Sequence, residues 1–139
     1  MADSTTLYGP QHVERYVATD GDEGYNWKNG TTILLLTTKG RKTGEDRVMP
    51  LIYREIDGNP VIVASKGGAE EQPGWYVNLV ADPNVKVQIK DDVFDATART
   101  AEGEERERLW KLMADVWPDY DAYQTKTDRE IPVVVLERR

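Results

Sequence analysis

Short apolar runs separated by turn residues recur along the chain and predict a protein built mainly from strands. Residues 33–36 are consecutive aliphatic residues followed by two threonines, a run too short for a buried helix and typical of a buried strand. In residues 85–89 aliphatic side chains alternate with polar ones, which predicts a strand with one face buried. Similar runs predict further strands over residues 47–53, 61–65, 93–100 and 131–136.

Three helices are predicted between these strands. Residues 11–19 place apolar side chains at helical spacing, and Pro73 opens a short helix that ends before Asp82. Residues 102–117 begin with glutamates, which the helix dipole favours, and continue with an apolar stripe that predicts the longest helix. Tight turns join several strands, and the long helix falls between the last two. This order predicts an α+β fold, an antiparallel sheet or small barrel of about six strands with helices packed outside.

At 139 residues, the chain is expected to form one domain, residues 1–139, with residues 1–10 as a loose polar arm. There is no cysteine, which excludes disulfides, thiolate zinc sites and cysteine nucleophiles. His12 is the only histidine, so no metal site is predicted. As a lone histidine near the start of the sequence, His12 is expected on the surface.

The sharpest contrast in the chain is a group of cations on an acidic protein. The formal net charge is -7, yet Lys39, Arg41, Lys42 and Arg47 lie close together in the sequence, beside two glycines. They fall at the predicted turn between the first two strands, where glycine lets a ligand approach the backbone closely. One interpretation is a charged tip that is merely solvated. The contrast favours the other, a hairpin whose tip and second strand bind an anion.

The remaining candidate chemistry is that of a cofactor-binding site. No nucleophile, base and orienting acid stand together, and neither the Walker A nor the Rossmann glycine pattern is present. What is present besides the cations is a Ser-Lys-Gly-Gly loop at residues 65–68 and an expected aromatic loop after Pro118, with Trp117, Tyr120 and Tyr123. This combination suits a large planar anionic cofactor that carries the chemistry itself. The sequence pI of about 4.8 argues against nucleic-acid binding.

Several motifs occur in a fixed order from residue 33 onward. They are residues 36–44 (Leu-Thr-Thr-Lys-Gly-Arg-Lys-Thr-Gly), Arg47 and residues 50–51, 63–68, 73–79, 82–83, 118–120, 123–124 and 127–133. Together they resemble the deazaflavin-dependent nitroreductase and quinone reductase family of actinobacteria. The resemblance implies a split β-barrel related to flavin-binding barrels. It also implies coenzyme F-420, a hydroxy-deazaflavin with a phosphate and a lactyl-oligoglutamate tail, and hydride transfer from its reduced form to a quinone or nitro-aromatic acceptor.

The resemblance further implies which residues form the site. The implied cofactor-binding residues are Arg41, Lys42, Thr43, Arg47, Val48, Met49, Pro50, Leu51, Ile52, Val63, Ala64, Ser65, Lys66, Gly74, Trp75, Tyr76, Val77, Asn78 and Tyr120. The implied catalytic residues are Ser65, Tyr120 and Tyr123, and the implied acceptor pocket is formed by Trp117, Tyr120 and Tyr123. Core packing is the competing interpretation for these aromatic residues. Of Trp75 and Tyr76, one is expected to pack inward and the other to face the cofactor.

One position departs from the family pattern. Family members that activate bicyclic nitroimidazoles carry Tyr where this chain has Trp117. An indole N–H donates a hydrogen bond but lacks the dissociable proton of a phenol. The departure argues against nitroimidazole activation, whereas quinone reduction needs only stacking and a source of protons.

Three alternatives stay open at this level. The same barrel with FMN would place the FMN phosphate at the cationic hairpin, and a non-catalytic deazaflavin carrier would bind the cofactor without turnover. A nucleic-acid module would use the same aromatic residues and cations, against the acidic balance. The expected partner is a small-molecule acceptor, and the expected state is a monomer or weak dimer. No signal peptide or membrane-spanning stretch is found, so the expected location is the cytoplasm, with peripheral contact at the inner face of the membrane as the alternative.

Overall fold

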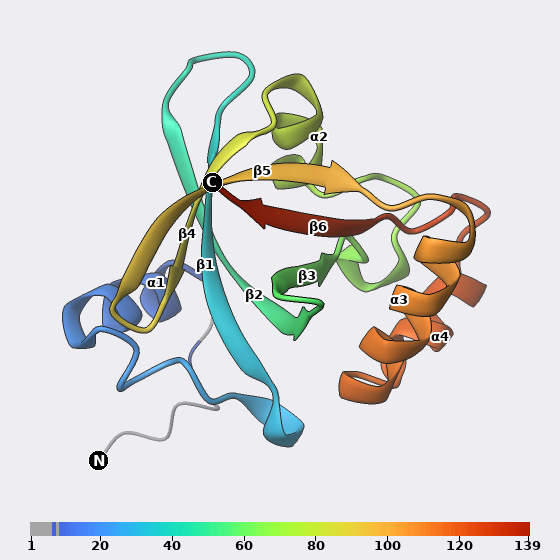
Figure 1. The fold of residues 1–139 in the computed structure, drawn as a ribbon, viewed down its shortest axis with the longest axis horizontal. Coiled ribbons are helices and arrows are strands. Elements are labelled where there is room, and N and C mark those ends of the chain that lie inside the picture. The colour runs from blue at the N-terminus through green and yellow to red at the C-terminus, as the bar shows by residue number, and fades with distance from the viewer. Residues whose placement is uncertain (1–6, 8) are drawn as a thin grey trace.

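A computed structural model describes Leu7 and residues 9–139. Six antiparallel strands form a closed barrel in the order β1-β2-β3-β6-β5-β4 (Figure 1), which confirms the predicted α+β barrel. The strands are β1 Thr32–Lys39, β2 Asp46–Ile56, β3 Asn59–Val63, β4 Asn84–Ile89, β5 Asp92–Thr100 and β6 Val133–Arg138. Strand β6 lies between β3 and β5, and its pairing with both closes the barrel.

The helices lie outside the barrel (Figure 1). They are α1 Gly9–Thr19, α2 Gly74–Ala81, α3 Gly103–Val116 and α4 Asp119–Thr125, with short 3-10 helices η2 Lys28–Gly30 and η3 Lys66–Gly68. The prediction of an aromatic loop after Pro118 was wrong, because α4 occupies this segment. Pro118 is the N-cap of α4, and Asp119 and Asp121 in its first turn favour the positive end of the helix dipole.

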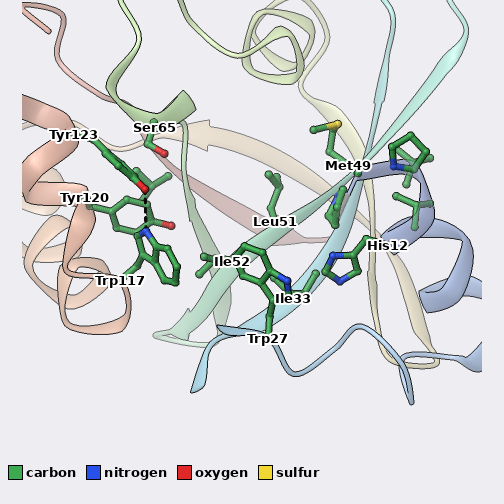
Figure 2. A pocket seen from close by; sticks show the side chains of 17 residues that line it. His12, Trp27, Ile33, Met49, Leu51, Ile52, Ser65, Trp117, Tyr120 and Tyr123 are labelled. Carbon is green, nitrogen blue, oxygen red and sulfur yellow. Dashed lines mark hydrogen bonds between the residues drawn. The ribbon is translucent and has the colours of Figure 1, made fainter. Parts of the chain in front are cut away.

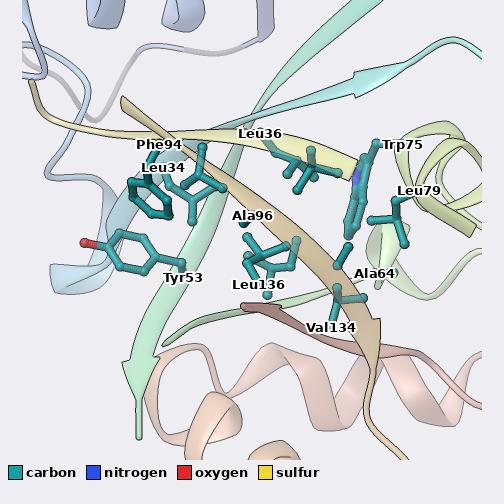
Figure 3. Close-up of a cluster of buried hydrophobic side chains, with 14 residues drawn as sticks. Leu34, Leu36, Tyr53, Ala64, Trp75, Leu79, Phe94, Ala96, Val134 and Leu136 are labelled. Atoms are coloured by element: carbon teal, nitrogen blue, oxygen red, sulfur yellow. The ribbon is translucent and has the colours of Figure 1, made fainter. Parts of the chain in front are cut away.

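The barrel interior is filled by large apolar side chains from all six strands and from α2 (Figure 3). Trp75 of α2 is 7% exposed and packs into this cluster, so it is the inward-facing member of the Trp75 and Tyr76 pair. Tyr76 is half-buried, and its hydroxyl lies 3.0 Å from Oγ1 of Thr100. The cluster consists of Leu34, Leu36, Tyr53, Ile62, Ala64, Trp75, Leu79, Val85, Val87, Phe94, Ala96, Ala98, Val134 and Leu136.

A second apolar layer covers the outside of β3 and β6. Val61, Val63, Val133 and Val135 point out of the barrel and pack with residues of α3 and α4, among them Met113. Strands β3 and β6 are therefore buried on both faces. That explains why they appear in the sequence as unbroken apolar runs rather than as alternating patterns.

Strand β2 leaves one edge of the barrel partly open. It pairs with β1 from Asp46 to Tyr53, but its pairing with β3 is confined to residues 54–56. Pro50 lies in the part that pairs with β1 alone, where a residue without a backbone N–H is tolerated. The barrel is therefore split between the first half of β2 and the segment that follows β3.

Helix α1 is fastened to the barrel by Tyr16, which is fully buried. The Tyr16 hydroxyl donates to the carbonyl oxygen of Ile33 at 3.0 Å and accepts from the backbone N–H of Lys90 at 2.7 Å. The helix begins at Gly9, earlier than predicted, and Leu7 before it is buried. The rest of the expected loose arm, residues 1–6 and 8, lies outside the described residues.

Candidate active site

A pocket of about 710 Å³ opens between α1 and α4, over the outer face of β1, β2 and β3 (Figure 2). Its floor is apolar and includes Ile33 of β1, Ile52 of β2 and Val63 of β3. The lining residues are Gly9, Pro10, His12, Val13, Trp27, Ile33, Val48, Met49, Pro50, Leu51, Ile52, Val63, Ser65, Gly67, Trp117, Tyr120 and Tyr123. A volume of this size is typical of sites for cofactors and small molecules.

The pocket brings together part of the site that the resemblance implied. The implied residues that line it are Val48, Met49, Pro50, Leu51, Ile52, Val63, Ser65, Trp117, Tyr120 and Tyr123. The implied residues outside its lining are Arg41, Lys42, Thr43, Arg47, Ala64, Lys66, Gly74, Trp75, Tyr76, Val77 and Asn78. The structure thus separates the implied residues into a group at the apolar pocket and a group at the hairpin and α2.

The hairpin group is organised by Asn78 of α2, which is 5% exposed. Its side-chain oxygen accepts from the guanidinium of Arg41 at 2.8 Å, and its Nδ2 donates to the hydroxyl of Thr38 at 3.2 Å. Asn78 therefore joins α2 to the β1–β2 hairpin, and its amide is occupied by protein partners. Lys42 and Arg47 are exposed, and among the described residues the ionic neighbour of Arg47 is Glu45, at 4.0 Å.

The loop after β3 is held by Arg129. Its guanidinium donates to the carbonyl oxygens of Ser65 and Ala69, each at 2.8 Å, and to that of Ala64 at 3.3 Å. It also donates to Oε1 of Gln72 at 2.8 Å. Desolvation lowers the pKa of Arg129, and no carboxylate forms an ion pair with it within the described part of the chain. Arg129 thus fixes the wall that Ser65 contributes to the pocket.

The same loop is in close contact with α4. A Cβ atom added at Gly68, whose φ is +83°, would lie 2.6 Å from the carbonyl oxygen of Tyr123. Only glycine fits this approach. The loop and α4 therefore form one continuous wall.

Two phenols and an indole form the α4 end of the pocket (Figure 2). Tyr120 is 4% exposed, and burial raises the pKa of its phenol, which keeps it protonated as a hydrogen-bond donor. Its ring packs edge-on against Tyr123, with centroids 6.2 Å apart. The indole Nε1 of Trp117 donates to the Tyr123 hydroxyl at 3.4 Å, so these side chains hold one another in place.

The opposite end of the pocket contains residues that sequence reasoning missed. The expectation that His12 lies on the surface was wrong: it is 2% exposed, and its Nε2 lies 2.7 Å from the carbonyl oxygen of Gly24. The centroid of its ring lies 6.3 Å from that of Trp27, which in turn stacks on Trp117 at 5.9 Å. One signal was available, because His12 and the buried Tyr16 are four residues apart and share a helix face.

The arrangement can hold a flat molecule between an apolar floor and aromatic walls, with phenol donors at one end. Among the described residues, no group of three or more His, Asp or Glu side chains could hold a metal ion. Within the same residues, no helix combines the length and apolar character needed to cross a membrane. The lining side chains themselves supply apolar and aromatic surfaces for binding and orientation, and hydroxyl groups for hydrogen bonding.

Comparison with known proteins gives concordant matches. A family model described as F420H(2)-dependent quinone reductase matches residues 10–138. An F420H(2)-dependent quinone reductase of Mycobacterium tuberculosis is 38% identical over 131 residues, which cover 92% of this chain and 88% of the relative. A solved structure described as an F420-H2 dependent reductase (FDR-A) is 52% identical, with a TM-score of 0.70, and the match covers 76% of this chain and 93% of that one.

A more distant structure shares the architecture. The heme storage protein HutZ of Vibrio cholerae is 16% identical, with a TM-score of 0.59 over 77% of this chain and 81% of that one. At this identity the match supports only the fold.

A further solved structure, described as a domain-swapped dimer, is 46% identical, with a TM-score of 0.74 over 90% of this chain and 93% of that one.

Proposed function

The chain belongs to the F420H(2)-dependent quinone reductase family, and from this premise we propose that its pocket positions reduced coenzyme F-420 and a quinone for direct hydride transfer. Nitro-aromatic compounds are included as acceptors of the same class. The observation that carries the proposal is the apolar pocket along the open edge of β2, which extends from Val48, next to the cationic Arg47, to the phenols of α4.

The residues present fit such a cofactor. Its phosphate and acidic tail would be held by Lys42 and Arg47, whose side chains are exposed beside the start of β2. Arginine can form paired hydrogen bonds with phosphate oxygens, while lysine supplies a point charge. The planar ring system would lie along residues 48–52, where β2 has an edge that β3 does not cover. Because the protein as a whole carries a net charge of -7, an anionic ligand would be attracted to this local cationic site and repelled by the rest of the surface.

When bound in its reduced form, the deazaflavin supplies the hydride. The protein contributes proximity and alignment, because the floor and the aromatic walls restrict a flat acceptor to a narrow set of orientations. Negative charge develops on the acceptor oxygen during transfer. Tyr120 and Tyr123 line the pocket, and in this proposal their phenols would donate hydrogen bonds to that oxygen, with the hydroxyl of Ser65 as a further donor.

The decisive experiment is anaerobic mixing of the protein with reduced coenzyme F-420 and a panel of quinones and nitroaromatics, followed by the absorbance of the oxidised cofactor. We expect protein-dependent oxidation with quinones and none when NADPH replaces the coenzyme, since the chain has no dinucleotide fingerprint. Turnover with NADPH alone would contradict the proposal. So would tight cofactor binding without oxidation by any acceptor, which is the behaviour of a carrier. Parallel titration with FMN tests the flavin alternative.

A further inference from the structure

Five aromatic rings form a continuous row along the wall of the pocket, from α1 to α4. We call this the aromatic row, and it consists of His12, Trp27, Trp117, Tyr123 and Tyr120. Neighbouring members lie within ring-contact or hydrogen-bond distance of each other, and all five line the same pocket (Figure 2). The hydride-transfer mechanism above uses only the α4 half of this row, so the half formed by His12 and Trp27 has no assigned role.

The α1 half of the row is fixed before any ligand arrives. The indole Nε1 of Trp27 donates to the carbonyl oxygen of Leu7 at 3.1 Å, and its ring stacks on Trp117 at an interplanar angle of 24°. His12 is fixed by its contact with Gly24. A Cβ atom added at Gly24, where φ is +100°, would lie 2.9 Å from the His12 ring, so glycine is required for this approach. Rigid aromatic walls bind flat ligands at a low entropic cost.

The hydrogen bond to Gly24 also determines what His12 offers to the pocket. A carbonyl oxygen only accepts, so the proton of the neutral ring is on Nε2, and Nδ1 carries a lone pair. Among the described residues, the hydrogen bond of the His12 ring is made through Nε2 and none is made through Nδ1. Within those residues, Nε of Arg106 is the side-chain polar atom that is fully enclosed without a hydrogen bond. Nδ1 is therefore an acceptor without a protein partner among the described residues, and it belongs to a side chain that is 2% exposed and lines the pocket.

We propose that His12 and Trp27 form a second acceptor subsite, which selects fused-ring quinones bearing a hydroxyl group on the ring remote from the reacting carbonyl. The inference rests on the proposed function and specifies its substrate class. The reacting carbonyl lies at the phenols of Tyr120 and Tyr123, the second ring stacks against Trp27, and its hydroxyl donates to Nδ1 of His12. A single-ring quinone fills only the α4 half and gains nothing from His12.

The test compares two ligands that differ by one group, a naphthoquinone with a hydroxyl on its second ring and the same naphthoquinone without it. Their dissociation constants are measured by calorimetry on the full chain saturated with oxidised coenzyme F-420, so that binding is read without turnover. We expect the parent to prefer the hydroxylated ligand by about three- to tenfold, as one hydrogen bond in a buried site provides. His12→Gln, whose amide can still donate to the Gly24 carbonyl, should abolish that preference.

Two further variants separate the contributions. His12→Asn places an oxygen acceptor near the position of Nδ1 and should retain part of the preference. Trp27→Leu should weaken both naphthoquinones relative to a benzoquinone while keeping the hydroxyl preference. Arg108→Ala is the control, because it removes an exposed ion pair with Asp57 outside the pocket lining. It should leave the affinity for all three quinones unchanged.

The result that overturns the inference is an equal preference for the hydroxylated ligand in the parent and in His12→Gln, or no preference in the parent. A change of coenzyme affinity in place of quinone affinity would also overturn it, because His12 would then contact the cofactor. Failure of the proposed function looks different. In that case none of the quinones oxidises the reduced coenzyme on the parent protein, whatever the calorimetry shows.

Discussion

The cationic hairpin and the walls of the pocket are adjacent in the molecule but differ in how their side chains are held. The hairpin cations are exposed, whereas the wall residues are fixed by hydrogen bonds and ring packing. At the hairpin, Lys42 is exposed and makes no ion pair or hydrogen bond within the described part of the chain, and the Lys39–Asp46 pair at 2.8 Å is open to solvent. In the walls, Arg129 makes four hydrogen bonds to the loop after β3. The rings of the aromatic row pack against one another, as Trp27 does on Trp117. Exposed ion pairs contribute about 0–1 kcal/mol to stability, whereas leaving a buried hydrogen-bonding group without its partner costs about 1–3 kcal/mol.

The difference has a functional meaning. In the proposed function, a flexible acidic tail would need charge near it but no single geometry, so exposed cations would suffice. Hydride transfer would need the reacting atoms in a narrow range of distance and angle, which residues held by the fold can provide. Each of the following changes either removes this contrast or measures it.

The largest effect is expected from Arg129→Met. The change removes the guanidinium donor from the carbonyl oxygens of Ala64, Ser65 and Ala69, of which Ser65 keeps the backbone N–H of Gly68, and we expect the free energy of unfolding to fall by about 2–4 kcal/mol. Quinone turnover should fall with it, because Ser65 and α4 lose their common support. Urea denaturation and steady-state kinetics measure the two effects. Arg108→Met, which breaks only the exposed pair with Asp57, should cost less than about 1 kcal/mol. If the two variants were equally stable, Arg129 would have no structural role.

The next effect is at the hairpin, where Lys42→Ala and Arg47→Ala should weaken cofactor binding with no change in the free energy of unfolding. Each removes a charge-assisted contact of roughly 1.5–3 kcal/mol, which corresponds to about a ten- to hundredfold loss of affinity. The loss should shrink in high salt, since the contact is partly solvated. Lys111→Ala, an exposed lysine on α3, is the control. Unchanged affinity in both hairpin variants at low salt would rule out this anion site.

A smaller effect is expected from Tyr120→Phe and Tyr123→Phe. Both keep the aromatic face and remove the donor, so kcat should fall by about three- to tenfold while cofactor affinity is retained. Tyr123→Phe also loses the bond from Trp117, which makes Tyr120→Phe the cleaner comparison. The measurement is acceptor kinetics at saturating cofactor. Parent-like kcat values in both variants for every acceptor would make the phenols packing residues and solvent the proton source.

The smallest effect is a pH dependence of stability that comes from Tyr16. Burial raises the pKa of Tyr16, which anchors α1, to about 12. Its folded pKa lies above the unfolded value of about 10, so its contribution is complete below pH 10 and is lost as the pH rises toward 12. Urea denaturation between these pH values should show a falling free energy of unfolding. Tyr16→Phe should be less stable at neutral pH and show a shallower decline. An equal slope in both proteins would contradict this assignment.

The strands could be predicted because their burial leaves a local signature. Residues 33–36 and 61–63 are apolar on both faces since the barrel interior lies on one side and helices lie on the other. Helix α4 was missed because its seven residues are too few for a helical period to show, and Pro118 before them signals a stop as readily as a start.

The site could be predicted only in part, for a related reason. The cationic hairpin is visible as a charge contrast in one short stretch of sequence. The implied positions on β2 came from family resemblance, and their roles stay predictions. His12 was misplaced because its burial depends on a contact with Gly24 that only the folded chain creates. The joining of the Ser65 loop to Arg129 is likewise a contact between distant segments that no local pattern reports.

The place of β6 between β3 and β5 bears on the order in which the molecule acquires its site. It is the sixth strand to be synthesised, yet its pairings with β3 on one side and β5 on the other close the barrel. Closing such non-local pairings is the slow part of folding for barrels. Arg129 and α4 directly precede β6, and they meet a loop translated about halfway along the chain. The early segments include α1 and the β1–β2 hairpin with its cations, whereas Arg129 and α4 are among the last parts of the chain to be made. During synthesis the cations of the hairpin are therefore present well before the α4 wall of the pocket.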